Sequence, residues 1–248
     1  MLTIIIPTLN HYSFTEECIN SIYEKTTDFT IIVINDGSTD ETNTKLHELI
    51  KTQSIIIHNV PQNLGFAKAV NQGIKLAETE LIAIFNNDMV AGHKWFENIL
   101  KGITECGWGM SSGKCIEPQM CPREQFEEFA TINAEMPSTF LKFAKEGPWL
   151  FKKEVFDEVG LFDEQFEYGQ YEDIDMLMRM AHAGFEFGVV ENSYVYHYGS
   201  ITQHGELLKR ISNKYIQKNR SKFEEKWGTI HFPLEQLEQI VKQGKENK

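Results

Sequence analysis

The first ninety residues alternate short isoleucine- and valine-rich runs with amphipathic stretches, and this alternation constrains the fold more than any other feature. Capping-box spacings at Ser13 and Glu16 and at Ser38 and Glu41 predict where the first two intervening helices begin. The pattern predicts an α/β fold with a mostly parallel central sheet. We expect strands at residues 2–6, 30–34, 55–60 and 81–85, with a third crossover helix at 66–77.

The second half of the chain is less regular. Glycine and proline interrupt residues 102–147, which we interpret as a loop-rich insert with one short helix at most. A helix at 171–183 ends at Gly184, and we expect strands at 187–190 and 194–197, a helix at 206–227 and a short helix after 233. We therefore predict one domain over 1–205, with a nucleotide-binding half (1–100) and an acceptor or catalytic half (101–205), followed by C-terminal helices at 206–248.

Composition narrows the class of protein. The 248 residues include 36 acidic and 24 basic side chains, a net charge of −12, which disfavours nucleic acid and anionic membranes as partners. There is no apolar run of about 18 residues and no signal-peptide pattern at the start. We expect a cytoplasmic protein, with peripheral docking at a membrane left open. The four cysteines lack a C-x-x-C pair, which favours reduced thiols over a zinc site.

Polar or glycine-containing turns follow each of the four strands, at residues 7–10, 35–38, 61–65 and 86–88. In sheets of this kind, ligands bind beyond the carboxyl ends of the strands, so the four turns define one candidate cleft. The chain has neither G-x-G-x-x-G nor G-x-x-x-x-G-K-[ST]. A dinucleotide cofactor and a P-loop are therefore disfavoured.

Several side chains in or near this cleft carry chemistry. Asp36 can accept hydrogen bonds from a base or ribose, although an Asx-turn or a helix cap explains this residue better when it is taken alone. Asp88, delivered from an apolar strand, suits a hard divalent cation bound to a diphosphate. Glu172, Asp173 and Asp175 crowd one helix start, where the helix dipole alone favours acids, yet clustered carboxylates also make a proton acceptor. Asp175 can pair with Arg179, and His197 is either an edge residue or a metal ligand.

An ordered set of motifs resembles the GT-A glycosyltransferases of the inverting family 2. The motifs, which cover roughly residues 2–200, are TIIIPTLN, IIVINDGSTDET, NLGFAKAVNQGI, LIAIFNND, WLFKKEVFDEVGLFDEQF, YEDIDMLMRMAHAGF and VYHYGS. A weaker match, KNRSKFEEKWG, resembles the tail helix of the rhamnosyltransferase-like branch.

This resemblance implies roles for individual residues. It implies that Asp173 is the general base, that Asp88 and His197 hold the metal, and that Trp149 and Glu172 face the sugar or acceptor. The D-x-D motif of the family falls on 86–88, where Asn86 replaces its first acid, a change that should weaken ribose or metal contacts. The implied donor-binding residues are Pro7, Thr8, Asn10, Asp36, Asn63, Gly65, Lys68, Asn71, Asn86 and Asn87.

The function implied is transfer of a sugar from a UDP- or dTDP-sugar to an acceptor hydroxyl, with inversion and with Mn²⁺ or Mg²⁺ as cofactor. A glycan or lipid-linked glycan is the expected acceptor, and a protein or a modified DNA base stays open. Two alternatives remain. A sugar nucleotidyltransferase would carry a glycine-rich basic loop after the first strand, which PTLNHYSF does not provide. A nucleotide-sugar-binding scaffold that has lost its chemistry would not need Asp88, Asp173 and His197.

Overall fold

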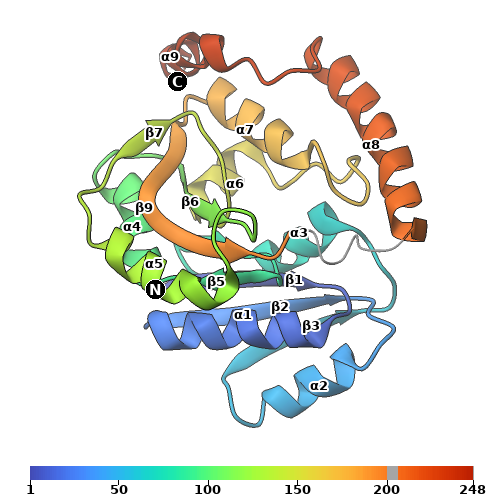
Figure 1. Cartoon of the computed structure of the whole chain (residues 1–248). Helices are drawn as coiled ribbons and strands as arrows, with labels where there is room; N and C mark the ends of the chain where they lie inside the picture. The colour runs from blue at the N-terminus through green and yellow to red at the C-terminus, as the bar shows by residue number, and fades with distance from the viewer. Residues whose placement is uncertain (200–205, 248) are drawn as a thin grey trace.

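The computed structural model describes residues 1–199 and 206–247, and helices cover both faces of one central sheet (Figure 1). The first part of the chain follows the predicted alternation of strands and helices. In chain order it contains β1 (Leu2–Thr8), α1 (Tyr12–Lys25), β2 (Phe29–Asp36), α2 (Thr42–Leu49), β3 (Ile55–Val60), α3 (Phe66–Leu76) and β4 (Leu81–Ile84). These strands are all parallel, in the spatial order β3-β2-β1-β4.

Alternate side chains of β1 enter different hydrophobic cores. Ile5 packs with side chains of α3 on one face of the sheet, whereas Ile4 and Ile6 pack with Ile19 of α1 on the other. All are fully buried, which explains why the strand is an uninterrupted apolar run rather than an alternating one. The register pairs Thr8 with Asn35, so the polar residues that end β1 and β2 emerge at the same edge.

The second part of the chain extends this sheet with strands of mixed direction, in the order β4-β8-β6-β9-β5. β7 also pairs with β9. The elements are β5 (Met89–Ala91), α4 (Trp95–Thr104), β6 (Met110–Ile116), α5 (Arg123–Ala134), β7 (Phe140–Lys142), β8 (Trp149–Lys152), α6 (Lys153–Val159), α7 (Glu172–His182), β9 (Phe187–His197), α8 (Glu206–Trp227), the 3₁₀ turn η2 (Leu234–Gln236) and α9 (Leu237–Glu246).

The prediction of a loop-rich insert at 102–147 was wrong. This segment supplies β6, an interior strand of the sheet, together with the twelve-residue helix α5. The sequence of β6, MSSGKCI, is too polar to be recognised as a strand. Its serines are nevertheless fully buried, because the hydroxyl of Ser111 donates to the carbonyl of Ile99 and that of Ser112 donates to Gly188. Helix α4, just before the insert, was not predicted either.

The two strands expected at 187–190 and 194–197 are one strand, β9. The polar residues between them stay extended because they hold neighbouring elements. The amide of Asn192 donates to the carbonyls of Ala134 and Met136, and the hydroxyl of Ser193 donates to the carbonyl of Trp95. Polar side chains thus belong to one continuous strand at positions where the sequence pattern suggests a break between two strands.

The first two helices are present, but they do not begin at the predicted caps: α1 begins at Tyr12, before Ser13, and α2 begins at Thr42, beyond both Ser38 and Glu41. Neither α1 nor α2 has a side-chain hydrogen bond at its N-cap. Ser38 instead accepts a hydrogen bond from the backbone amide of Asn10, and Asp40 accepts one from the backbone amide of His11. The residues that resemble caps therefore tie the loop after β1 to the loop after β2.

The C-terminal helices pack against α7. Leu237 and Val241 of α9 are buried in the core on the α7 side, and Gly184 and Gly244 lie in close backbone contact. Phe223 of α8 is fully buried against Phe166 and Tyr171. In Figure 1, α8 runs along the outside of the molecule beside the chain that leads into α7. Within the described ranges, every helix is too short or too polar to cross a membrane.

Candidate active site

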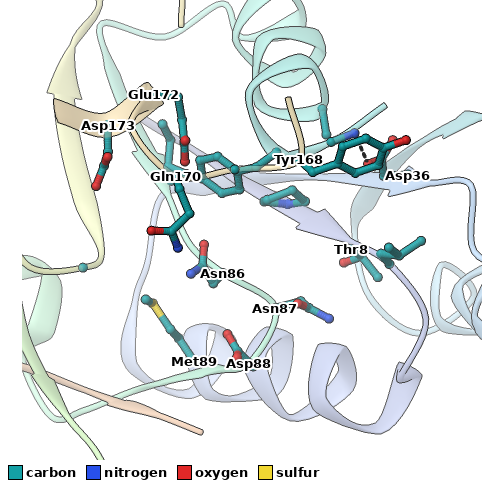
Figure 2. Close-up of a pocket in the computed structure, with 18 of the residues that line it drawn as sticks. Thr8, Asp36, Asn86, Asn87, Asp88, Met89, Tyr168, Gln170, Glu172 and Asp173 are labelled. Atoms are coloured by element: carbon teal, nitrogen blue, oxygen red, sulfur yellow. Dashed lines mark hydrogen bonds between the residues drawn. The ribbon is translucent and has the colours of Figure 1, made fainter. Parts of the chain in front are cut away.

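A pocket of about 390 Å³ opens at the carboxyl ends of β1, β2 and β4. One side is formed by strand ends and the turns that follow them; we call these residues, Pro7, Thr8, Asp36, Asn63, Gly65, Asn86, Asn87 and Asp88, the sheet wall. The opposite side is formed by the residues that lead into α7; we call these, Tyr168, Gly169, Gln170, Glu172 and Asp173, the turn wall. Figure 2 shows Asn86 between Thr8 at one end and Asp173 at the other.

Asp36 organises the sheet wall. Its Oδ1 accepts a hydrogen bond from the amide of Leu64 at 2.8 Å, and its Oδ2 accepts one from the amide of Gly65 at 3.0 Å. Burial raises the pKa of this carboxyl, and the two amide hydrogen bonds oppose that shift. Gly37 lies beneath the same turn with φ +73°, and a Cβ there would lie 2.4 Å from the carbonyl carbon of Gln62. The loops after β2 and β3 are therefore fixed before any ligand binds.

Asp88 and His197 meet at the floor of the pocket. The His197 Nε2 lies 3.3 Å from Asp88 Oδ1, and the backbone amide of Tyr198 donates to the carbonyl of Asp88. Burial lowers the pKa of the imidazole, but the hydrogen bond and negative charge of Asp88 outweigh burial, so the pKa lies above its ordinary value. The sequence separation of the two residues hides this pairing, which the β5–β9 pairing produces.

This pair fits part of the ligand set of a divalent cation. Neighbouring ligands of an octahedral ion with bonds of about 2.1 Å lie roughly 3 Å apart, close to the observed 3.3 Å. Among the described residues, no group of three or more His, Cys, Asp or Glu side chains could enclose a metal. Of the described His, Cys, Asp and Glu side chains, only Asp88 and His197 are paired in this way here, and a substrate would have to supply further ligands.

The turn wall holds two adjacent carboxyl groups in different environments. Glu172 is 6% exposed, and its burial raises the pKa to about 7, opposed by a backbone hydrogen bond and by Lys145. Asp173 is more exposed; its Oδ2 forms an ion pair with Lys145, and its Oδ1 accepts a hydrogen bond from the amide of Ile174. The two acids thus differ in burial and in their partners although they are neighbours in sequence.

Three buried polar atoms of the pocket have no hydrogen-bond partner among the residues that the structure describes. They are Thr8 Oγ1, the indole nitrogen of Trp149 and Glu172 Oε2. Buried polar atoms are rarely left unsatisfied in native proteins. The Thr8 hydroxyl can both donate and accept, the Glu172 oxygen can accept and the indole nitrogen of Trp149 donates, which suits a ligand rich in hydroxyl groups.

Charge also restricts the ligand. The lining residues that the structure describes include four carboxyl groups, those of Asp36, Asp88, Glu172 and Asp173, but no lysine or arginine. An anionic ligand such as a diphosphate would be repelled unless a cation accompanied it. The Asp88–His197 pair is placed to hold such a cation.

Most predicted site residues come together in this pocket, but three of them do not line it. The side chain of Asn10 accepts hydrogen bonds from the amides of Thr39 and Asp40, outside the pocket. Asn71 is 1% exposed and exchanges hydrogen bonds with the backbone of Phe162, which joins α3 to the loop after α6. Lys68 lies on α3, two residues beyond Phe66, which does line the pocket. Their predicted contacts with a donor remain predictions.

Sequence reasoning missed several residues that shape the pocket. Lys145 and Cys115 lie in the supposed insert, which was interpreted as loop, so their contacts could not be anticipated. Tyr168 and Gln170 precede the acidic pair directly, and that proximity was an available signal. Tyr215 of α8 also lines the pocket, with its ring centroid 4.5 Å from that of Tyr168, and a lone tyrosine in a polar helix gives no signal.

Comparison with known proteins agrees with this geometry. The family model described as Glycosyl transferase family 2 matches residues 3–160. The uncharacterized glycosyltransferase EpsJ of Bacillus subtilis is 27% identical over 188 residues, which cover 68% of this chain and 53% of EpsJ. Validoxylamine A glucosyltransferase of Streptomyces hygroscopicus is 24% identical over 164 residues, 60% of this chain and 36% of that protein. The chain thus spans about half or less of the length of these two relatives.

Solved structures share the fold. The mannosyltransferase PcManGT from Pyrobaculum calidifontis, in complex with GDP-Man and Mn²⁺, superposes with a TM-score of 0.68 at 17% identity, covering 99% of this chain and 73% of that one. Residues 1–349 of TarS from S. aureus, in complex with UDP-GlcNAc, give a TM-score of 0.68 at 16% identity, covering 97% of this chain and 70% of that one. The predicted GT-A fold is therefore confirmed.

Proposed function

Because the chain belongs to glycosyltransferase family 2, we propose that it transfers a sugar from a UDP- or dTDP-sugar to an acceptor hydroxyl in one displacement, with inversion at the anomeric carbon. The observation that carries this proposal is the pocket itself: Asp88 and His197 at its floor and Asp173 on its turn wall face one space. That arrangement provides a cation site for a leaving diphosphate and a separate carboxylate for the acceptor.

The nucleotide is proposed to bind along the sheet wall. Asp36 retains acceptor capacity beyond its two backbone hydrogen bonds, because each carboxylate oxygen has more than one acceptor site. Thr8 Oγ1 is buried nearby without a partner and can satisfy a ribose or base group. Both residues belong to strand ends whose register is set by the sheet, so the site needs little rearrangement on binding.

Asp88 and His197 are proposed to hold Mn²⁺ or Mg²⁺, with diphosphate oxygens and water completing the coordination. When bound, this cation would neutralise the charge that develops on the leaving nucleoside diphosphate. PcManGT, which shares the fold, binds Mn²⁺ together with GDP-Man. The described lining of the pocket has four carboxyl groups and no lysine or arginine, so electrostatic repulsion also favours binding of a diphosphate together with a cation.

Asp173 is proposed to act as the general base. As the acceptor oxygen attacks the anomeric carbon, its proton passes to an Asp173 carboxylate oxygen, and the bond from the anomeric carbon to the diphosphate oxygen breaks. Lys145 occupies Oδ2 in the absence of substrate, so the acceptor hydroxyl must share or replace that contact. Glu172 and the indole of Trp149, each with an unsatisfied polar atom, are proposed to bind hydroxyl groups of the sugar or acceptor.

The acceptor is proposed to be a glycan or a lipid-linked glycan, because saccharide hydroxyl groups could both donate to Glu172 Oε2 and accept from the indole nitrogen of Trp149. The tail motif that resembles the rhamnosyltransferase-like branch favours a dTDP-sugar as donor, whereas TarS binds UDP-GlcNAc. The choice between them is open to direct measurement.

The test is release of nucleoside diphosphate from a panel of UDP-, dTDP- and GDP-sugars, with and without Mn²⁺. Release from one donor that requires Mn²⁺ and is lost in Asp88→Asn would support the proposal and identify the donor. If no donor is hydrolysed and calorimetry detects no Mn²⁺-dependent nucleotide binding, the transferase proposal fails and a binding or scaffold role replaces it.

A further inference from the structure

The turn wall is built from unusually strained backbone. Three residues at 168–171, which lead into α7, have left-handed φ angles without being glycine: Tyr168 at 61°, Gln170 at 75° and Tyr171 at 75°, with Gly169 at 103° among them. L-residues avoid this region and remain there only where the surrounding structure holds them. The turn ends at the N-terminus of α7, immediately before Glu172 and Asp173. Whatever holds this turn therefore also sets the position of both acids.

One side chain from α8 supplies most of the hydrogen bonds to this turn. The Asn219 amide nitrogen lies 2.9 Å from the carbonyl oxygen of Glu167, 3.0 Å from that of Gly169 and 3.1 Å from that of Gln170. Its Oδ1 accepts a hydrogen bond from the amide of Glu167 at 3.2 Å. Asn219 is fully buried. The interaction needs a donor and an acceptor on one short side chain, which asparagine provides and aspartate does not.

Other residues of α8 reinforce this contact around its edge. Lys218 forms an ion pair with Glu167 at 2.6 Å, and Tyr215 packs against Tyr168. Farther along, Lys226 and the indole nitrogen of Trp227 both contact Asp175 Oδ1, at 2.8 Å and 2.9 Å. Helix α8 is thus fastened to the turn before α7 and to the first turn of α7 itself.

We propose that Asn219 is a positioning residue for the transfer reaction: it fixes the strained turn at 167–171 so that Asp173 meets the acceptor hydroxyl. The proposal rests on the proposed role of Asp173 as the base. Asn219 lies outside residues 3–160, which the family model matches, and it is not itself among the residues that line the pocket, although its hydrogen bonds reach the backbone of Gly169 and Gln170, which are. Its effect on catalysis therefore passes through the turn.

Two substitutions test this role. Asn219→Ala removes all four contacts, and Asn219→Asp keeps nearly the same shape but replaces the donor with a charge that faces three carbonyls. A displacement of about 1 Å in a catalytic group can cost roughly 10²-fold in rate, so both variants should lose about that factor in turnover. Arg220→Ala, at the exposed neighbouring position, is the matched control and should keep wild-type turnover.

The decisive measurement is a double-mutant cycle with Asp173→Asn, followed as nucleoside diphosphate release. If Asn219 acts through Asp173, adding Asn219→Ala to Asp173→Asn should cause little further loss, because the group it positions is already disabled. A further loss as large as in the wild-type background would overturn the proposal and indicate a general structural role. Full turnover of Asn219→Asp would also overturn it.

Hydrogen–deuterium exchange gives a second readout that does not depend on activity. Asn219→Asp should speed exchange of backbone amides at 167–171 selectively, leaving β1 and β2 unchanged. Unchanged exchange at 167–171 would contradict the proposal even if turnover fell. Failure of the proposed function gives a different result, because Asp173→Asn itself would then keep wild-type turnover. If only the present inference fails, Asp173→Asn still loses turnover, but substitution of Asn219 does not act on turnover through Asp173.

Discussion

The two walls of the pocket place their functional groups by different means. On the sheet wall, Thr8 and Asp36 end strands whose parallel register fixes them, and the carboxylate of Asp36 is already bonded to two backbone amides. On the turn wall, Glu172 and Asp173 follow a strained turn that depends on a side chain from a helix about fifty residues away in sequence. The sheet wall follows from the pattern of strands in the sequence, whereas the turn wall depends on contacts between residues far apart in the sequence.

The contrast places the proposed nucleotide-binding residues on the sheet wall and the proposed general base on the turn wall. A nucleotide site made of strand ends can be reproduced in any chain that forms the sheet. If Asp173 is the base, as proposed, small changes in the turn or in α8 would move it while the sheet wall stayed unchanged. Such an arrangement would let the turn wall vary independently of the strand ends.

The largest expected effect comes from the turn wall. Asp173→Asn should lower turnover by about 10²–10⁴-fold, the usual contribution of a general base, while nucleoside diphosphate binding stays nearly unchanged because the sheet wall is intact. Steady-state release and calorimetry measure the two quantities. Asp157→Asn, an exposed substitution on α6, serves as the control. A parallel loss of binding and turnover would mean that the two walls are not separable.

Glu172→Gln tests the burial of a carboxyl group on the turn wall through the pH dependence of the free energy of unfolding. The pKa of Glu172 is about 7 in the fold, so folding disfavours its ionised form, and the wild type loses stability as pH rises from about 4.5 to about 7. The glutamine variant should therefore gain stability relative to the wild type between pH 5 and pH 8, by at most about 3 kcal/mol. Urea denaturation at both pH values measures the difference.

The matched control is Glu128→Gln, at an exposed position on α5, which should change stability equally at the two pH values. A pH-independent difference for Glu172→Gln would show that its carboxyl is not held neutral by burial.

Asp36→Asn tests the sheet wall. Asparagine cannot accept from both amides of the 63–65 turn, so we expect a loss of about 1–3 kcal/mol in the free energy of unfolding and a raised KM for the donor. The kcat at saturating donor should fall much less than in Asp173→Asn. Denaturant titration and steady-state kinetics measure these effects. A loss confined to kcat would contradict the assignment of this wall to donor binding.

The smallest expected effect concerns the cation. His197→Ala should raise the Mn²⁺ concentration that gives half-maximal release by about tenfold or more. In the wild type that concentration should also rise as pH falls, because the pKa of His197 is raised by Asp88 and a proton then competes with the metal. His47→Ala, exposed on α2, is the control. Identical Mn²⁺ dependence in both variants would remove His197 from the cation site.

The sequence predicted the sheet wall better than the turn wall, for physical reasons. The first four strands are rich in isoleucine and valine, so they could be predicted from the sequence, and the residues that follow parallel strands share an edge. Strand β6 was invisible because Ser111 and Ser112 are buried through hydrogen bonds rather than through apolar character. Tertiary packing alone brings three further residues to the site or its turn, and no periodicity in the sequence indicates these contacts. They are Lys145, Tyr215 and Asn219.

The attachment of α8 to the turn has a consequence for modular exchange. A chimera that joins the nucleotide half of one relative to the acceptor half of another would normally be cut after the last strand of the sheet, with the tail taken from either parent. In this chain the tail carries Asn219 and Trp227, whose partners lie at 167–175. The turn and the tail must therefore be exchanged together. We expect a chimera to be active only when residues 167–175 and 215–227 come from the same parent.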